Sequence, residues 1–363
     1  MKNQNDMDFH FKRYTFDGIP AFRLNPLRRR YRRKFLNLIQ NDRIRLKSVS
    51  ECACSNTSFY PIAFKDRFGL PFNNQMCDRC GLLILNPQMT DDSLEVYYKE
   101  IYHPLVVGTP KGVLLDDLVY ERQGDVIFTF THKCINSELI NVCEVGCAGG
   151  NNLIVFRDSA NQKGIRCKLY GCEFEDHYVS QARQRGIQIT NKGTESLVSF
   201  GVKFDLIILS HVFEHFTDLE KELSILKGVL SNEGLLYIEV PGLMNLERYN
   251  SDLIDYLVHA HNYNFNLASL RNVLVSNGFA LVNGNERVQG LFRIEKNNRR
   301  KRSVSNNPEC ILQFLRSTES AFNKNITCKT RLKRSVWRLL YRMEYLLLLK
   351  KRMTMTKFGF ANR

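Results

Sequence analysis

The feature of this 363-residue sequence that most restricts its fold is the alternation of short apolar runs with helical patterns after residue 138. Runs of strand length predict five strands, which are Leu139–Val145, Lys168–Cys172, Ile187–Thr190, Phe204–Leu209 and Leu235–Val240. Between the last two, apolar residues at 219, 223, 226 and 230 form a helical stripe. A helix over about 267–276 then precedes two further strands, Phe279–Val282 and Gly290–Ile294. This alternation predicts an α/β fold with a mostly parallel seven-stranded sheet and helices on both faces.

A glycine-rich turn follows the first predicted strand and reads Glu144-Val145-Gly146-Cys147-Ala148-Gly149-Gly150. Glycines let a backbone turn tightly and approach a ligand, and the helix expected just beyond offers free N–H groups to an anion. A Gly-Lys-Ser/Thr sequence is missing from this turn, which excludes a phosphate-gripping P-loop. Taken alone, the turn could equally open a dinucleotide-binding fold or be only a turn. Glu144, at the strand end, can accept a hydrogen bond from an amine.

Two more predicted strands end in polar residues. Glu173 follows the second strand, 27 residues after Gly146, and an acid there can hold both hydroxyls of a ribose through its two oxygens. By itself it could also be a surface glutamate. The run Phe204–His215 is a buried strand that ends in a polar cluster beginning at Ser210. In open α/β sheets, ligands lie at this carboxyl edge.

Taken together, Glu144–Gly150, Glu173 and Phe204–His215 resemble motifs of class I methyltransferases that depend on S-adenosylmethionine (SAM). The resemblance covers about residues 138–245 and implies a Rossmann-like fold with SAM as cofactor. It places Glu144 and Gly146 near the methionine end of SAM and Glu173 on the ribose. The further cofactor-binding residues that it implies are Ala148, Gly150, Ser210 and, near the adenine, Glu195. The family glycine expected at position 148 is an alanine here, which leaves room but tightens the turn.

A separate cysteine segment precedes this region. Cys52 and Cys54 are followed by Cys77 and Cys80, the second pair having the spacing of a zinc knuckle. Two close pairs supply four thiolates to one tetrahedral zinc, which leaves no open position for water, so the predicted site is structural. It would stabilise a segment too short to fold on its own core. Four unrelated buried cysteines are the alternative.

This cysteine segment also resembles the zinc-binding lead domain of a methyltransferase subgroup that includes sugar methyltransferases and relatives found with polysaccharide-building enzymes. The resemblance rests on Cys80-Gly81-Leu82 continuing to Asn86-Pro87, on Asp66–Leu70, on the tyrosines at 97, 98 and 102, and on Ala260–Phe265. It implies a small-molecule or saccharide acceptor, such as a nucleotide sugar or a polysaccharide precursor. The sugar C-methyltransferases of the group carry a long second α/β domain at the C-terminus, where this chain has a basic tail of about 65 residues.

Histidines are the candidates for removing a proton from the acceptor, because methyl transfer to a hydroxyl benefits from a base with a pKa near neutrality. Four of the eight histidines lie in two places, His211 and His215 after the fourth strand and His259 and His261 after the fifth. We rank the catalytic candidates His215, His261 and His211. Any one of them could instead be structural, and a metal site at the Glu214-His215 pair lacks a third firm ligand.

The net charge of +15 is concentrated at the two ends of the chain. Residues 1–50 carry +9, residues 296–363 carry +15, and the middle carries −9. The basic clusters are Arg28–Lys34, expected as a short amphipathic helix, Arg299–Arg302, and Lys350–Arg352 near Trp337. They favour contact with an anionic membrane surface or an acidic polymer, although a solvated basic helix is an equal alternative. Nucleic acid is disfavoured because the sequence has no RNA-reading motif.

Finally, the N-terminus has no apolar signal-peptide core, and no run approaches the roughly 18 apolar residues of a membrane span, so we expect a cytoplasmic protein. The expected order is a basic segment (1–50), a zinc module (51–88), a helical connector (89–137), a SAM-binding domain (138–298) and a basic helical tail (299–363). The predicted function is SAM-dependent methyl transfer. The alternatives are a catalytically inactive SAM-fold scaffold and a methyltransferase acting on RNA or protein.

Overall fold

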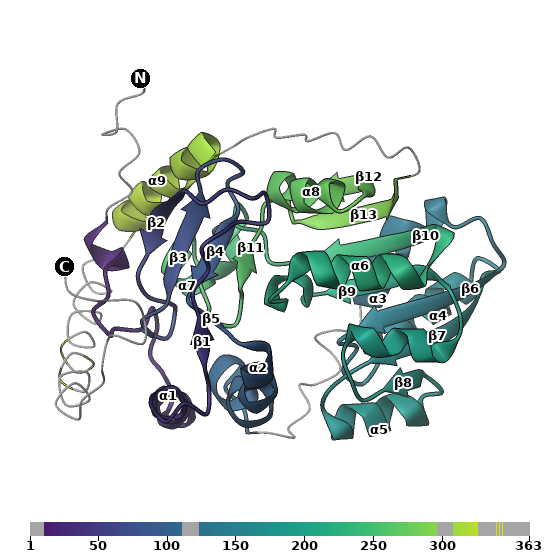
Figure 1. Cartoon of the computed structure of the whole chain (residues 1–363), viewed down its shortest axis with the longest axis horizontal. Coiled ribbons are helices and arrows are strands. Elements are labelled where there is room, and N and C mark those ends of the chain that lie inside the picture. The colour runs from purple at the N-terminus through teal and green to yellow at the C-terminus, as the bar shows by residue number, and fades with distance from the viewer. Residues whose placement is uncertain are drawn as a thin grey trace. The chain divides into compact units, whose positions relative to one another are not determined.

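The computed structural model describes residues 11–110, 123–295 and 308–325, together with positions 339, 341 and 343. The chain divides into two compact units (Figure 1). We call Gly112–Gly242 with Phe265–Val304 the sheet unit, and Met1–Lys111 with Leu243–Asn264 and Ser305–Arg363 the cysteine unit. Residues 243–264 therefore belong to the cysteine unit, although they lie inside the range 138–298 expected for the SAM-binding domain.

The sheet unit contains a seven-stranded sheet in the order β12-β13-β10-β9-β6-β7-β8. Strands β10, β9, β6, β7 and β8 pair in parallel, and β13 pairs antiparallel with both β10 and β12. Every predicted strand is present, and the mostly parallel α/β sheet is confirmed. The bounds are β6 (Leu139–Val145), β7 (Arg166–Cys172), β8 (Gln188–Thr190), β9 (Phe204–Ser210), β10 (Leu230–Glu239), β12 (Phe279–Asn285) and β13 (Gln289–Ile294).

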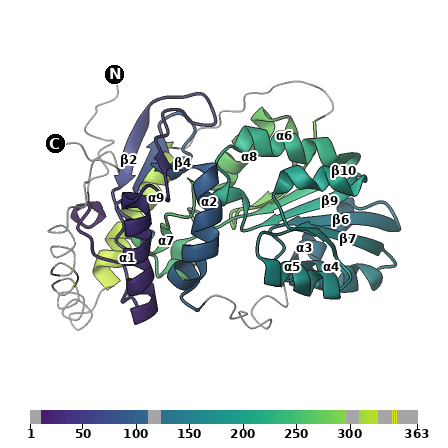
Figure 2. The ribbon, with the colours of Figure 1, turned by 60° about the horizontal axis from the view of Figure 1, so that its bottom comes forward.

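Helices cover both faces of this sheet, as predicted (Figure 2). One face carries α3 (Gln123–Thr131), α4 (Asn151–Asn161) and α5 (Asp176–Gln184), and the other carries α6 (Leu219–Val229) and α8 (Leu267–Ser276). The apolar stripe predicted on α6 is buried at Leu219, Leu223 and Leu226. Short 3-10 turns, η5 (His132–Cys134), η6 (Thr194–Phe200) and η7 (Phe213–His215), complete the unit. Burial of such apolar faces is the main stabilising contribution to this architecture.

The cysteine unit is built on a four-stranded antiparallel sheet in the order β11-β4-β3-β2, and β1 pairs with β5. The strands are β1 (Leu46–Lys47), β2 (Phe59–Ala63), β3 (Asn73–Cys77), β4 (Leu83–Asn86), β5 (Gln88–Met89) and β11 (Tyr263–Asn264). The helices are η2 (Lys12–Tyr14), α1 (Pro26–Gln40), α2 (Asp91–Tyr97), the π-helix η3 (Tyr98–Val107), η8 (Leu246–Tyr249), α7 (Leu253–Tyr256) and α9 (Pro308–Asn325).

The predicted basic helix is α1, which starts at Pro26 with Asn25 as its N-cap. Two of its arginines bond within the unit. Arg28 donates to the carbonyls of Leu105, Val106 and Val107 at 2.9–3.1 Å, and the buried Arg32 donates to Gly18 and Gly69 at 3.0 Å. Part of this basic cluster is therefore structural.

The other basic clusters, Arg299–Arg302 and Lys350–Arg352, and Trp337, lie outside the described residues. None of the helices described here is both long and apolar enough to cross a membrane.

Candidate functional site

The carboxyl edge of the parallel strands gathers most of the predicted cofactor residues. Val145 in β6 pairs with Cys172 in β7 and with Leu209 in β9. The glycine turn, Glu173 and Ser210 each follow or end one of these strands, so the fold places them side by side at one edge.

The glycine turn adopts left-handed backbone conformations that explain its composition. Gly146 has φ +64°, and a Cβ there would lie 2.8 Å from Val212 Cγ2, so the turn packs directly against the loop after β9. Gly150 has φ +81° and is the N-cap of α4. Ala148, where the family has glycine, also has positive φ, +43°, which is strained for alanine.

Glu144 is a buried acid in this turn, with only 2% of its surface exposed. Its Oε1 accepts a hydrogen bond from Asn152 Nδ2 at 2.7 Å, whereas its Oε2 and Asn152 Oδ1 are buried without a hydrogen-bond partner among the described residues. Burial raises the pKa of Glu144 to about 8. An unsatisfied buried oxygen is costly, so this pair fits a ligand that brings a donor, such as an ammonium group. Asn152 was not predicted as a site residue, because nothing in the sequence distinguishes it from other asparagines in helices.

Glu173 is held by backbone amides rather than by side chains. Its Oε1 accepts from the amides of Phe174 and Glu175 at 2.7 and 3.1 Å, and its Oε2 accepts from Ala148 at 3.0 Å. Burial raises its pKa, and these three amides oppose that shift. Each carboxylate oxygen has two lone pairs, so Oε1 is fully used, and Oε2 keeps one lone pair that can accept a ribose hydroxyl. The neighbouring Phe174 is 53% exposed, and Glu195 is exposed in η6 after β8.

The loop after β9 brings together two of the three predicted catalytic histidines. Glu214 Oε1 lies 3.8 Å from His211 Nδ1 and 3.8 Å from His215 Nε2. Glu214 is buried, and that burial raises its pKa to about 8. His211 has φ +57°, a conformation uncommon for any residue with a side chain.

The histidines near residue 260 belong to the cysteine unit. His259 is fully buried, with Nδ1 2.6 Å from Asp66 Oδ2 and Nε2 3.0 Å from the hydroxyl of Tyr97. It is therefore a satisfied structural histidine. His261, the second-ranked catalytic candidate, follows it in the same unit.

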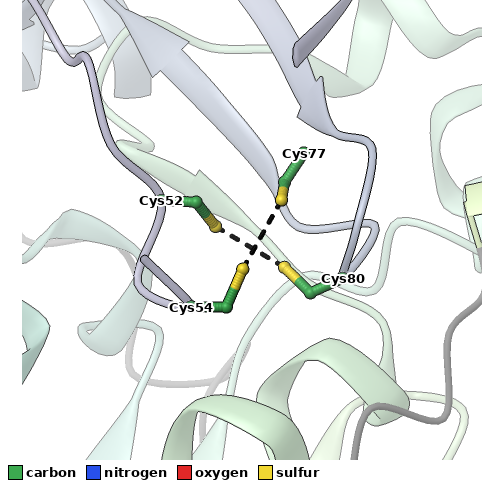
Figure 3. A group of neighbouring side chains, drawn as sticks. All are labelled: Cys52, Cys54, Cys77 and Cys80. Atoms are coloured by element: carbon green, nitrogen blue, oxygen red, sulfur yellow. Dashed lines mark hydrogen bonds between the residues drawn. The ribbon is translucent and has the colours of Figure 1, made fainter. Parts of the chain in front are cut away.

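The four predicted zinc ligands converge in the cysteine unit (Figure 3). The Sγ atoms of Cys52 and Cys80 are 3.5 Å apart, and those of Cys54 and Cys77 are 3.6 Å apart. The second pair turns through Gly81, which has φ +72°, with the Gly81 amide donating to the Cys77 carbonyl at 3.0 Å. Four sulfurs around a tetrahedral zinc would lie about 3.8 Å apart. The cluster fits such an ion closely.

Comparison with known proteins agrees with this geometry. A family described as a methyltransferase domain matches residues 120–283. The C-methyltransferase NovU of Streptomyces niveus is 26% identical over 217 residues, which cover 58% of this chain and 47% of that protein. This chain thus spans about half the length of the curated relative that it matches.

Two solved structures are also similar to the chain. A SAM-dependent methyltransferase from Clostridium acetobutylicum is 12% identical, with a TM-score of 0.38 over 56% of this chain and 99% of that one. Magnesium protoporphyrin IX methyltransferase from Synechocystis is 17% identical, with a TM-score of 0.36 over 55% and 96%. From the family match and the curated relative, residues 120–283 form a methyltransferase domain.

Proposed function

We propose that the protein transfers a methyl group from SAM to a small-molecule or saccharide acceptor, such as a nucleotide sugar or a polysaccharide precursor. The observation that carries this proposal is the buried Glu144 Oε2, which lacks a hydrogen-bond partner among the described residues at the carboxyl edge of the sheet. A buried acceptor of this kind fits a ligand that ends in an ammonium group. The name of the curated relative, a C-methyltransferase, supports methyl transfer as the reaction.

In this proposal SAM, when bound, supplies a methyl group activated on a sulfonium sulfur. Glu144 binds the ammonium group of the methionine end, and the backbone at Gly146, Ala148 and Gly150 approaches the cofactor closely. Glu173 accepts a ribose hydroxyl through Oε2, Ser210 lines the neighbouring end of β9, and Glu195 contacts the adenine. The chain's task is then to orient the acceptor and accept its proton. The candidates for proton acceptance are His215, His261 and His211.

Calorimetry with S-adenosylhomocysteine (SAH), the demethylated product, tests the cofactor site without a known acceptor. We expect wild-type protein to bind SAH, and Glu173→Ala to bind it about 10-fold to 100-fold more weakly, as removal of hydrogen bonds to a charged group predicts. Glu220→Ala, on the exposed side of α6, is the matched control and should bind as wild type does. Failure of well-folded wild-type protein to bind SAH would contradict the proposal.

We also propose a structural zinc ion held by Cys52, Cys54, Cys77 and Cys80, supported by the sulfur separations given above. Closely spaced thiols suit a reducing compartment, so a cytoplasmic location is part of the same proposal. We expect elemental analysis to find one zinc per chain, with Cys77→Ser losing the metal and melting at a lower temperature. Cys310→Ser, at an exposed position in α9, should keep both the zinc and the melting temperature. Zinc-free wild-type protein with an unchanged melt after chelation would refute the site.

We also propose that the basic regions bind an anionic partner. Contact with an acidic polymer or a peripheral membrane surface is supported by the sequence charge, because the cysteine unit alone carries 32 Lys/Arg and 17 Asp/Glu.

A further inference from the structure

The loop after β9 contains both a candidate base, His211, and a buried acid, Glu214. The ranking of the catalytic histidines from the sequence assigned no role to this acid. We propose that His211 is the side chain that accepts the acceptor's proton, and that the buried Glu214 is a positioning residue that holds the His211 ring. The proposal rests on the methyl-transfer function proposed above and deepens it.

The backbone of His211 is the first observation. His211 directly follows β9 at the carboxyl edge, and its amide donates to the carbonyl of Glu239 at 2.8 Å. Its φ of +57° lies in the left-handed region, which residues with a side chain rarely adopt outside tight turns and functional sites. The adjacent Val212 packs against Gly146 of the glycine turn. His211 therefore belongs to the loop that packs against the glycine turn.

Exposure distinguishes the two histidines that flank Glu214. The side chain of His211 is 46% exposed, whereas that of His215 is 14% exposed and that of Glu214 is 2% exposed. Glu214 faces His211 at Nδ1, so Nε2 lies on the opposite side of the same ring. Glu214 faces His215 at Nε2 instead. A carboxyl group at Nδ1 is the arrangement of an oriented histidine base.

The separation of 3.8 Å is longer than a hydrogen bond, and such contacts in ligand-free sites commonly tighten when ligands bind. Within the sheet unit, titratable groups that face Glu214 include His211, His215 and, from β10, Glu239. Burial makes Glu214 a weaker acid than usual, with a pKa of about 8. Glu214 is ionised above that pH, where its carboxylate stabilises a proton on Nδ1, and the tautomer with the proton on Nδ1 presents a basic lone pair at Nε2.

The acceptor atom gives its proton to His211 Nε2, and its electron pair forms the bond to the methyl carbon. The carbon–sulfur bond breaks with its electron pair remaining on sulfur. The resulting imidazolium has its Nδ1–H toward the carboxylate of Glu214, which stabilises the new positive charge.

Histidine titration by NMR tests the pairing without any acceptor. The full chain is labelled with ¹³C at the histidine rings, and the His211 signal is assigned by its loss in His211→Asn, since asparagine tolerates a left-handed backbone. We expect the wild-type His211 signal to show two steps, one for its own ring and one near pH 8 that reports ionisation of Glu214. Glu214→Gln, which matches the shape of the protonated acid, should remove the second step. The signal of His177, on α5, should be identical in both proteins. Identical His211 titrations in wild type and Glu214→Gln would overturn the proposal.

The rate of methyl transfer distinguishes the role of His211 from that of His215, once an acceptor has been found by screening nucleotide sugars. We expect His211→Asn to lower the methyl-transfer rate by about 100-fold or more at unchanged SAH affinity, as loss of a general base predicts. His215→Asn should lower it less, and a larger loss in His215→Asn would overturn the assignment. If wild-type protein does not bind SAH, the proposed function fails, while the titration still decides whether His211 and Glu214 form a pair.

Discussion

At the scale of single residues, burial determines the protonation of the acids at the carboxyl edge. Glu144 and Glu214 are both buried, and burial raises the pKa of each to about 8. Both acids bind a proton more tightly in the folded chain than in the unfolded one, where the usual pKa is 4.5. The stability that this tighter binding contributes is complete below pH 4.5 and is lost as the pH rises toward 8.

The Glu144→Gln variant is predicted to weaken this pH dependence, because glutamine does not ionise. Between pH 5.5 and 7.5 the free energy of unfolding should fall less steeply than in wild type, by about 1 kcal/mol per pH unit. Urea unfolding at several pH values measures the slope, and Glu220→Gln on α6 should give the wild-type slope. Equal slopes in wild type and Glu144→Gln would mean that Glu144 is already ionised in the folded chain.

Sequence patterns could place Glu144, Glu173 and Ser210 because each stands at the end of a recognisable strand, and strand ends meet at one edge. They could not reveal that Asn152 reaches Glu144, nor that Glu173 is held by three backbone amides. They also could not show the positive φ of His211. These features depend on how loops from different strands pack, which no local spacing encodes.

At the scale of elements, the strands and helices of the sheet unit follow from hydrophobic periodicity, and β6 has the predicted bounds. The strands of the cysteine unit were not predicted as strands. In β3, Asn73, Asn74 and Gln75 give no apolar alternation, and β11 has only two residues. The π-helix η3 contains Pro104, and Arg28 of α1 supplies donors to the carbonyls at its end. Such elements are stabilised by tertiary partners rather than by their own sequence.

Helix α8 begins with a capping box, in which two residues satisfy each other's backbone amides. Asn266 Oδ1 accepts from the amide of Ser269 at 2.8 Å, and Ser269 Oγ accepts from the amide of Asn266 at 3.1 Å. We expect Asn266→Ala to lower the free energy of unfolding by about 1 kcal/mol, since the amide of Ser269 loses its partner. Asn266→Ser, which retains a capping oxygen, should recover most of that loss in urea unfolding. Equal losses in both variants would show that the cap is not what stabilises α8.

At the scale of the whole molecule, the two units differ in charge and in how the chain builds them. The sheet unit holds 20 Lys/Arg and 20 Asp/Glu, so all of the net charge belongs to the cysteine unit. The cysteine unit is assembled from three separate stretches of chain, and the sequence could not show this. Periodicity describes neighbours along the chain, whereas the stretch Leu243–Asn264 joins the unit through long-range pairs such as Tyr263 with Ile84.

One ion-pair network joins these three stretches. Arg13 binds Asp252 at 2.7 Å and Glu319 at 2.7 Å, and the two carboxylates have only 5% and 2% of their side chains exposed. The hydroxyl of Tyr14 also donates to Glu319 at 2.5 Å. The N-terminal stretch, the 243–264 stretch and α9 are therefore connected through a single guanidinium group, and bidentate geometry of this kind requires arginine.

We therefore predict that Arg13→Ala destabilises the cysteine unit by about 3 kcal/mol or more, because it leaves two buried carboxylates without their cation. Arg13→Lys should lie between wild type and Arg13→Ala, since lysine keeps the charge and loses the fork of donors. Lys99→Ala, which removes the exposed pair with Glu95, is the control and should leave the urea midpoint unchanged. Removal of the proposed zinc ion should add to the loss, because the cysteine cluster and Arg13 make separate contacts within the same unit. If Arg13→Ala instead unfolds at the wild-type midpoint, apolar packing alone joins the three stretches, and the network contributes nothing to closing the unit.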